Sequence, residues 1–172
     1  MAKKEQSLLL LDLVKLRRKT ELNGTNKSLN MRQKEAVKNI LKGEARPLPY
    51  IIHGPPGTGK TVTMVETILQ ILSLLPDSRL LVATPSNSAA DLITERILER
   101  LNLYPGQLVR LVSYTYWNDG RVPPFLRPYA AIADLSDDPD KSGTSGPNSI
   151  KYCSRDVLGR HKITIGTCTS MV

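Results

Sequence analysis

A glycine-rich run, preceded by an apolar stretch and followed by a helical pattern, is the feature that most constrains this chain. The run reads His-Gly-Pro-Pro-Gly-Thr-Gly-Lys-Thr over residues 53–61. From Gly54 to Thr61 it satisfies the eight-position phosphate-loop pattern, which requires a strand before it and a helix after it. Tyr50–His53 is a short apolar run, and residues 59–75 have helical periodicity. This combination predicts an α/β domain with a ligand-binding turn after a strand.

The chemistry of this run favours a nucleoside triphosphate as its ligand. Glycines at 57 and 59 let the backbone curl so that successive N–H groups point at phosphate oxygens. The N-terminus of the following helix adds a partial positive charge. Lys60 is expected to reach the β and γ phosphates, and the Thr61 hydroxyl is expected to be a Mg²⁺ ligand. The alternative, a chance glycine turn, is disfavoured by the complete octapeptide in this context.

The remaining apolar patterns alternate between strand and helix along the chain. We expect helices at 30–43, 59–75 and 88–101 and strands at 50–53, 80–83, 108–112 and 163–165. The strands lack side-to-side alternation, which is typical of a parallel sheet buried on both faces. The 172 residues, 40% of them hydrophobic, amount to about one domain. We predict one α/β domain over residues 29–172, after a basic helical lead-in over residues 1–28.

The charge of the chain is concentrated in its first part. The net charge is +8, and residues 1–50 hold 12 basic and 5 acidic residues, a net of +7. This excess makes an anionic partner plausible, although a solvated basic helix face explains it equally well. The longest apolar run, Leu8–Leu11, is far shorter than a membrane span and lacks the features of a secretory signal. We therefore expect a soluble intracellular protein.

Residues 115–150 contain five prolines and an acidic-polar run, so we expect an irregular insertion that is disordered over 137–148. Cys153 and Cys168 lack metal-ligand spacing and are interpreted as ordinary small side chains. His53 is interpreted as a strand residue that faces the core, because no metal partners surround it in the sequence.

Two further positions have both a structural and a functional interpretation. Asn30 and Gln33 have the spacing of a capping box at a helix start. In the turn over residues 84–91, one of Ser86, Asn87 and Ser88 is expected to cap the helix, and Asp91 suits its first turn. The same turn follows a parallel strand, where ligands gather in open α/β sheets, so its hydroxyl, amide and N–H groups could also bind a nucleic-acid backbone.

Several segments together resemble the Upf-like superfamily 1 RNA helicases. Within this family, the segments most closely resemble the Armitage type, a branch tied to small-RNA silencing and cytoplasmic ribonucleoprotein granules. It covers residues 29–170 and is most specific at 46–63 and 85–92. The segments are Leu-Asn-x-x-Gln at 29–33, Arg-Pro-x-Pro-Tyr-Ile-Ile-x-Gly-Pro-Pro-Gly-Thr-Gly-Lys-Thr-Val-Thr at 46–63, Pro-Ser-Asn-Ser-Ala-Ala-Asp-Leu at 85–92 and Ile-Thr-Ile-x-Thr-Cys at 163–168.

This resemblance implies a RecA-like P-loop NTPase fold and roles for individual residues. Gln33 matches the residue that recognises adenine, and this role is favoured over the cap. Ser86 and Asn87 match a motif that contacts the backbone of single-stranded nucleic acid, which implies RNA binding here, and Thr167 matches a later backbone-contacting motif. His53 departs from the family's usual aromatic residue. The residues that match or complete the ATP-binding loop are Gly54, Pro55, Pro56, Gly57, Thr58, Gly59, Lys60 and Thr61.

The sequence departs from the family's pattern in one important respect. The family ends a strand with an Asp-Glu pair, which holds Mg²⁺ and activates water, and no adjacent Asp-Glu occurs in the 172 residues. The nearest imitation, Ala130–Asp134, is followed by Leu135 and contains alanines, which are poor strand formers. The chain thus resembles the first half of one motor domain, and we expect ATP binding with hydrolysis near background.

The resemblance implies an ATP-dependent RNA helicase with ATP, Mg²⁺ and single-stranded RNA as its ligands. Silencing or ribonucleoprotein-granule proteins are the implied partners, and the cytoplasm is the implied location. Two alternatives stay open. One is a non-catalytic module that binds ATP and RNA, and the other is a P-loop DNA helicase or repair ATPase, which fits residues 85–92 less well.

Overall fold

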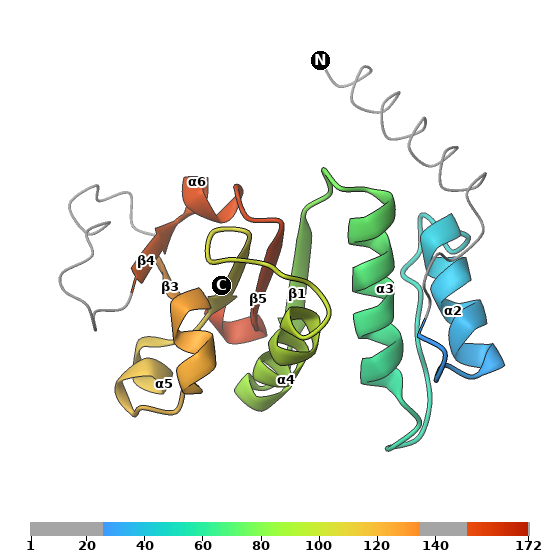
Figure 1. The fold of residues 1–172 in the computed structure, drawn as a ribbon, viewed down its shortest axis with the longest axis horizontal. Coiled ribbons are helices and arrows are strands. Elements are labelled where there is room, and N and C mark those ends of the chain that lie inside the picture. Colours follow the sequence, from blue (N-terminus) through green and yellow to red (C-terminus); the bar gives the residue numbers. More distant parts are fainter. Residues whose placement is uncertain (1–25, 135–150, 172) are drawn as a thin grey trace, which may run out of the picture. The chain divides into compact units, whose positions relative to one another are not determined.

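The computed structural model describes residues 26–134 and 151–171. The chain divides into two compact units, residues 1–78 and 79–172 (Figure 1). The expected lead-in helix before residue 26 and the expected disordered run at 137–148 lie outside the described residues. In the described part of the chain, no helix combines the length and apolar character needed to cross a membrane.

The first unit contains two helices, α2 (Met31–Lys42) and α3 (Lys60–Leu74), which pack against each other. Helix α2 begins after the capping residue Asn30 and ends at Gly43, whose φ of 66° is left-handed. This agrees with the helix expected at 30–43. Its apolar face buries Val37 and Leu41. Helix α3 begins directly after the glycine-rich turn and ends shortly before Pro76, close to the bounds expected from periodicity.

Tyr50–His53 does not form the expected strand. The backbone of these residues has no regular secondary structure, and His53 is exposed rather than facing the core. Ile51 is 79% exposed. A strand requires hydrogen bonds from a neighbouring strand, and the sheet in the described part of the chain is built entirely from residues of the second unit. The apolar pattern was therefore not sufficient to make this segment a strand.

The second unit is a five-stranded parallel sheet with helices on both faces, and it confirms the expected α/β class. The strand order is β1-β5-β2-β3-β4. The strands are β1 (Leu80–Thr84), β2 (Leu108–Leu111), β3 (Ala130–Asp134), β4 (Lys151–Ser154) and β5 (Ile163–Thr167). The helices are α4 (Asn87–Leu98), α5 (Tyr114–Asn118), α6 (Arg155–Leu158) and the 3-10 turns η1 (Pro124–Tyr129) and η3 (Cys168–Ser170).

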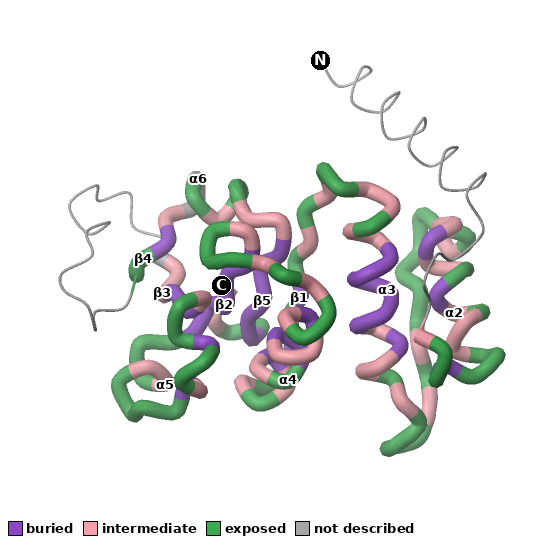
Figure 2. Tube along the Cα trace, in the orientation of Figure 1, coloured by how far each residue is buried: buried purple, intermediate pink, exposed green. Residues whose placement is uncertain are grey.

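The two faces of this sheet carry separate apolar clusters. Successive residues of a strand point to opposite faces, so neighbours in β3 contribute to different clusters. Ala130 packs with Val112, Val122 and Leu126 on the face that α4 and η1 cover. Its neighbour Ala131 packs on the other face, in a cluster that includes Leu158 of α6. The strands β2 and β5 are buried along their length (Figure 2).

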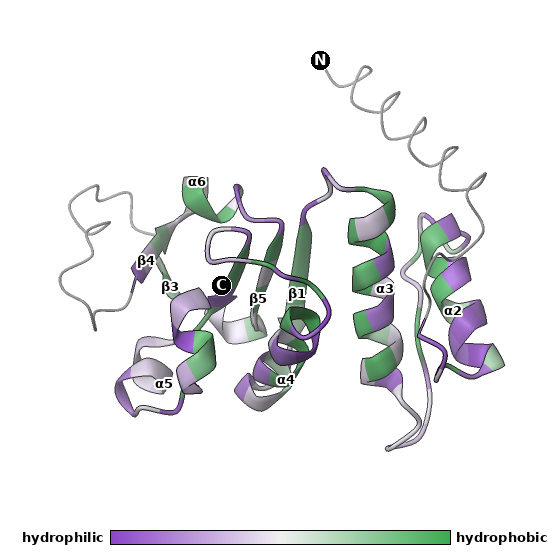
Figure 3. Ribbon diagram, viewed as in Figure 1, coloured by the Kyte–Doolittle hydropathy of each residue, from purple (hydrophilic) through white to green (hydrophobic). Residues whose placement is uncertain are grey.

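Strand β1 lies at one edge of the sheet. It pairs with β5 in a register that runs from Leu80 opposite Ile163 to Thr84 opposite Thr167. The strand is hydrophobic over most of its length (Figure 3). Leu81 is nevertheless 70% exposed, whereas Val82 and Thr84 are buried. In the described part of the chain, strand β1 therefore buries its side chains on one face only.

The segment expected to be irregular is more regular than predicted. Helix α5, the turn η1 and strand β3 occupy much of residues 114–134, and β4 begins at Lys151. Alanine has a weak intrinsic preference for strands, but β3 lies between β2 and β4 and pairs with both. Ala130 and Ala131 are 3% and 5% exposed. Pairing and burial on both sides outweigh the local preference of these alanines.

Candidate functional site

The glycine-rich turn of the first unit has the backbone of a phosphate-binding loop. Gly57 and Gly59 have φ values of 78° and 82°, which side chains with a Cβ rarely adopt. Gly59 is the N-cap of α3, and no side chain caps the helix there. The first turn of α3 also lacks acidic residues. The free N–H groups and positive end of the helix dipole therefore face the loop, which suits an anion.

Lys60 holds its ammonium group over this loop. Its Nζ donates to the carbonyl oxygens of Gly54 and Pro55 at 2.7 and 2.8 Å. Carbonyl oxygens are neutral, so the contact orients the ammonium without neutralising its charge. The side chain is exposed. Lys60 thus supplies a positioned cation at the turn, and its contact with phosphates stays a prediction.

The residues of the loop fit a nucleotide triphosphate with Mg²⁺. Around Gly57, a Cβ would meet no heavy atom within 4 Å, so the turn is open at this point. Thr58 Oγ1 donates to Pro55 O at 2.8 Å, which closes the turn from within. Thr61 follows Lys60 in the first turn of α3 and is partly buried. Its role as a Mg²⁺ ligand stays a prediction, and the hydroxyl chemistry suits that ion.

Gln33 combines a structural role with a contact to the loop. Its Oε1 accepts from the backbone N–H of Asn30, and its own N–H donates to Asn30 Oδ1, both at 2.9 Å. These bonds form the capping box that the sequence indicates. Its Nε2 donates to Thr58 O at 3.0 Å. That bond uses one hydrogen of an amide that carries two, so the adenine role remains a compatible prediction.

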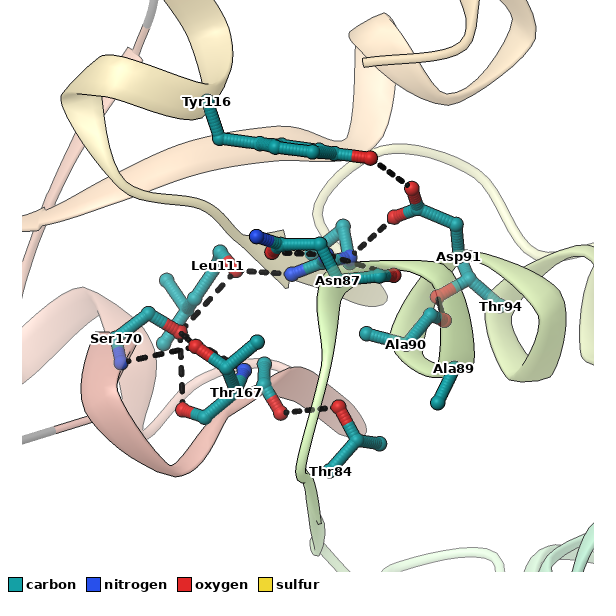
Figure 4. A network of polar contacts seen from close by, with 12 residues as sticks. Thr84, Asn87, Ala89, Ala90, Asp91, Thr94, Leu111, Tyr116, Thr167 and Ser170 are labelled. Carbon is teal, nitrogen blue, oxygen red and sulfur yellow. Dashed lines mark hydrogen bonds and ion pairs between the residues drawn. The ribbon is translucent and has the colours of Figure 1, made fainter. Parts of the chain in front are cut away.

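The predicted RNA-binding residues lie at neighbouring strand ends in the second unit. Ser86 caps α4, since its Oγ accepts from Ala89 N at 3.2 Å. Thr167 ends β5 and caps η3, since its Oγ1 accepts from Ser170 N at 3.2 Å. Thr84 joins the two ends, because its hydroxyl contacts Ser86 O at 2.9 Å and Gly166 O at 3.2 Å. The structure therefore brings the 86–87 turn and Thr167 together at the carboxyl ends of the neighbouring strands β1 and β5 (Figure 4).

The expectation for Asp91 was wrong. Asp91 lies beyond the first turn of α4, which contains no acidic residue. Its carboxylate instead forms an ion pair with Arg110, with Oδ1 at 2.8 Å from Arg110 Nε. Its Oδ2 accepts from the Tyr116 hydroxyl at 2.7 Å. The carboxylate thus connects helix α4 to strand β2 and helix α5.

Sequence reasoning missed Arg110, the most deeply buried charged residue of the described chain. It is fully buried in β2, and its guanidinium contacts Asn87, Asp91 and the carbonyl of Leu111. The signal was a single basic residue inside the apolar run Leu-Val-Arg-Leu-Val at 108–112. A charge in such a strand must find a partner, because desolvation without one is costly.

Tyr116 and Cys153 have pKa values above their ordinary range. Burial, followed by the hydrogen bond to Asp91 and the charge of that carboxylate, raises the pKa of Tyr116. Burial alone raises the pKa of the Cys153 thiol. Cys168 is exposed. Among the described side chains, no group of three or more His, Cys, Asp or Glu residues could hold a metal ion.

A cavity of about 480 Å³ in the second unit lies apart from the predicted site residues. Its lining includes Leu111 and Ala133, which belong to the sheet face opposite α4, together with Leu158 and Met171. None of the ATP-binding or RNA-binding residues expected from the sequence lines it. The candidate chemistry is therefore at the loops, where parallel α/β proteins commonly bind ligands.

A parallel sheet covered by helices, together with a phosphate-loop turn at a helix start, defines an α/β nucleotide-binding type of domain. The chain belongs to the AAA domain family, whose match covers residues 28–142. No solved structure matches the chain.

Several curated proteins are similar in sequence. The chain is 43% identical over 155 residues to "Probable RNA helicase armi" of Drosophila melanogaster, over 88% of this chain and 13% of that protein. It is 59% identical over 86 residues to "RNA helicase Mov10l1" of Homo sapiens, over 50% of this chain and 7% of that protein. A yeast protein, "DNA polymerase alpha-associated DNA helicase A" of Saccharomyces cerevisiae, is 44% identical over 89 residues, 52% of this chain and 12% of its own length. The similarity to Armitage-type helicases is confirmed.

Proposed function

We propose that the chain contributes to an ATP-dependent RNA helicase activity. In this activity it binds ATP with Mg²⁺ and single-stranded RNA. The observation that carries the proposal is the placement of Ser86, Asn87 and Thr167 at adjoining strand ends, joined through Thr84. Two of the similar proteins are named RNA helicases. Because the chain spans only 7 to 13% of the length of these relatives, the helicase activity of a whole protein is part of this proposal.

Each part of the chain has its own task in this proposal. The loop over 54–61 binds the phosphates, with Lys60 countering their charge and Thr61 holding Mg²⁺. Gln33, which contacts the loop through Thr58, recognises adenine. Bound Mg²⁺ supplies charge neutralisation at the phosphates. The 172 residues contain no adjacent Asp-Glu, so we propose that this chain alone binds ATP and hydrolyses it at close to the background rate.

The hydrogen bonds at the 86–87 turn indicate how RNA would be bound. Asn87 Oδ1 accepts from Arg110 Nη2 at 2.9 Å, so the amide nitrogen of Asn87 is directed away from the guanidinium. Neutral N–H and hydroxyl donors of this kind contact phosphate oxygens and sugars, and they position a strand without selecting its sequence. RNA targets in silencing or in ribonucleoprotein granules, and a cytoplasmic location, belong to this proposal through the Armitage-type similarity.

A binding experiment tests the RNA part of the proposal. Fluorescence anisotropy of a labelled oligouridylate, titrated with the full chain, should show binding that weakens as salt is raised. Asn87→Asp keeps an oxygen for Arg110 but replaces the amide donors with a negative charge, so we expect affinity to fall about tenfold or more. The control Asn102→Asp makes the same change at an exposed loop position and should leave affinity unchanged.

Two outcomes of this titration would contradict the proposal. One is absence of RNA binding by the unmodified chain, and the other is equal loss of affinity in both variants. Repeating the titration with the matching DNA strand addresses the alternative of a DNA helicase. This alternative has a named example, because the similar yeast protein is called a DNA helicase. Tighter binding of DNA than of RNA would favour that alternative, since the 2′-hydroxyl distinguishes the two strands.

A further inference from the structure

The second unit contains a polar network centred on Arg110, of which the proposed function uses only the hydrogen bond to Asn87. Arg110 lies in the middle of the sheet, in β2, between β5 and β3. It is fully buried, and the apolar residues Leu108, Val109 and Leu111 of the same strand are buried too. A buried arginine is rare and is retained only with partners for its charge and its hydrogens. The partners of this arginine therefore indicate what it does.

All three nitrogens of the Arg110 guanidinium are engaged. Nε forms the ion pair with Asp91, and Nη1 donates to Leu111 O. Nη2 donates to Asn87 Oδ1 at 2.9 Å and contacts Asn87 O at 3.4 Å. The planar fork of the guanidinium thus holds both the side chain and the backbone of Asn87. Apart from the bond to Leu111 O within β2, its contacts converge on the first two turns of α4.

Asp91 is in turn held by a second group. Tyr116, on α5, donates its hydroxyl to Asp91 Oδ2, while Arg110 contacts Oδ1. Figure 4 shows Tyr116 and Asp91 meeting above Asn87. Both oxygens of the carboxylate are therefore fixed, one by a cation and one by a phenol. Three elements of the unit, α4, β2 and α5, are linked through this carboxylate.

The network determines the orientation of the Asn87 amide. An amide group can be turned by 180° with little change in shape, which exchanges its donor and acceptor ends. With the nitrogen facing Arg110, two donors would oppose each other, so the oxygen must face the guanidinium. The nitrogen and its two hydrogens are then directed to the other side. An amide nitrogen in this orientation has hydrogens to donate, as a contact with a phosphate oxygen needs.

We propose that Arg110 is a positioning residue for nucleic-acid binding, which orients the Asn87 amide toward the RNA backbone and is itself held through Asp91 and Tyr116. The inference rests on the proposed function, because it assigns Asn87 to RNA contact. Arg110 does not itself reach the RNA, since it is fully buried. Its effect is transmitted through the side chain and carbonyl oxygen of Asn87.

The main test compares Arg110→Lys with the unmodified full chain. Lysine keeps a cation for Asp91 but lacks the planar fork, so it cannot hold Asp91 and Asn87 in the same geometry. We expect the affinity for a labelled oligouridylate to fall about tenfold, while the affinity for MgATP is unchanged. In NMR spectra, the side-chain amide signals of Asn87 should move in Arg110→Lys before any RNA is added. A role limited to stability would not couple these signals to RNA affinity.

A second variant keeps the test decisive if Arg110→Lys fails to fold. Tyr116→Phe removes one hydroxyl from the network, and we expect RNA affinity to fall about two- to fivefold. The control is Tyr114→Phe on the same helix, where the side chain is 61% exposed, and it should bind RNA as the unmodified chain does.

The outcomes separate this inference from the proposed function. If the unmodified chain binds no RNA, the proposed function fails and the inference fails with it. If the unmodified chain binds RNA and Tyr116→Phe binds it equally well, the inference alone is overturned. Equal RNA affinity in a folded Arg110→Lys chain would overturn it too. Reduced affinity together with shifted Asn87 signals and unchanged MgATP affinity would support it.

Discussion

At the scale of single residues, a buried ion pair and an exposed one show how burial changes the effect on stability of losing one charged partner. Arg110 and Asp91 are 0% and 12% exposed at their side chains, whereas Arg121 and Asp119, which pair at 3.0 Å, are 66% and 37% exposed. In a buried pair, removal of one partner leaves the other charge desolvated and unpaired. In an exposed pair, water and salt replace the lost partner.

Asp91→Asn tests this difference. It keeps the size of the side chain but leaves Arg110 without a counter-charge, so we expect a loss of about 3–5 kcal/mol in the free energy of unfolding. Asp119→Asn is the matched control and should change it by less than about 1 kcal/mol. Urea denaturation of both variants measures the two values. Similar losses in both would contradict the assignment of Arg110 and Asp91 as a buried pair.

Tyr116 predicts a stability change at high pH. Its pKa is raised above the ordinary value of 10.0, so between the unfolded and folded pKa the native state holds a proton that the unfolded state has lost. Its contribution to stability is therefore fully present below pH 10 and is lost as pH rises above it. The free energy of unfolding should decline more steeply above pH 10 in the unmodified chain than in Tyr116→Phe. Parallel declines would show that Tyr116 is not the responsible group.

At the scale of elements, the turn before α3 depends on two glycines for different reasons. Gly57 and Gly59 both have positive φ values, which disfavour a side chain at either position. Only at Gly59 would a Cβ also collide with a neighbour, since it would lie 2.5 Å from Gln33 Nε2. The close approach ties the start of α3 to the cap of α2. Backbone strain and packing can therefore be separated at this turn.

Alanine substitutions at the two positions test this distinction. Gly57→Ala should cost about 1–2 kcal/mol of unfolding free energy from backbone strain alone. Gly59→Ala should cost more, because the Gln33 amide must also move. Denaturant unfolding of each variant gives the comparison. A Gly57→Ala chain less stable than Gly59→Ala would contradict the described contact between the turn and Gln33.

Element by element, local patterns were sufficient where local forces decide the structure. The capping box of Asn30 and Gln33, the helix after the glycine turn, and strands β1, β2 and β5 could all be predicted from short stretches. Strand β3 could not, because its alanines become a strand only through pairing on both sides. The prediction of a strand at Tyr50–His53 was wrong for the opposite reason, because an apolar run that pairs with no neighbouring strand does not form a strand.

The candidate site likewise combines features set by local sequence, which could be predicted, with features set by the fold, which could not. The phosphate loop is contiguous in the sequence, so its glycines, Lys60 and Thr61 could be recognised directly. The Arg110 network joins residues separated by 19 to 25 positions, and only the fold brings them together. The resemblance assigned backbone contacts to Thr167 and to the 86–87 turn separately, and the register of β1 with β5 brings them together. Spacing alone did not predict how Asp91 would be used.

At the scale of the whole molecule, charge and chemistry are distributed unevenly. Residues 1–50 carry +7 of the total charge of +8, whereas residues 51–172 hold 12 basic and 11 acidic residues. Residues 1–25, which lie outside the described residues, account for +3 of this charge, and residues 26–50 account for +4. The proposed ligand contacts in the described part depend on hydroxyl, amide and backbone groups and on Lys60. The proposal therefore rests on these positioned groups more than on net charge.

The central claim is that the chain binds ATP through the loop at the start of α3. Isothermal titration of the full chain with MgATP tests it most directly, with Lys60→Ala as the variant and Lys38→Ala, an exposed lysine of α2, as the control. We predict saturable binding that requires Mg²⁺, is weakened about tenfold or more by Lys60→Ala, and is unchanged by Lys38→Ala. Absence of binding in the unmodified chain, or equal binding by Lys60→Ala, would contradict the claim.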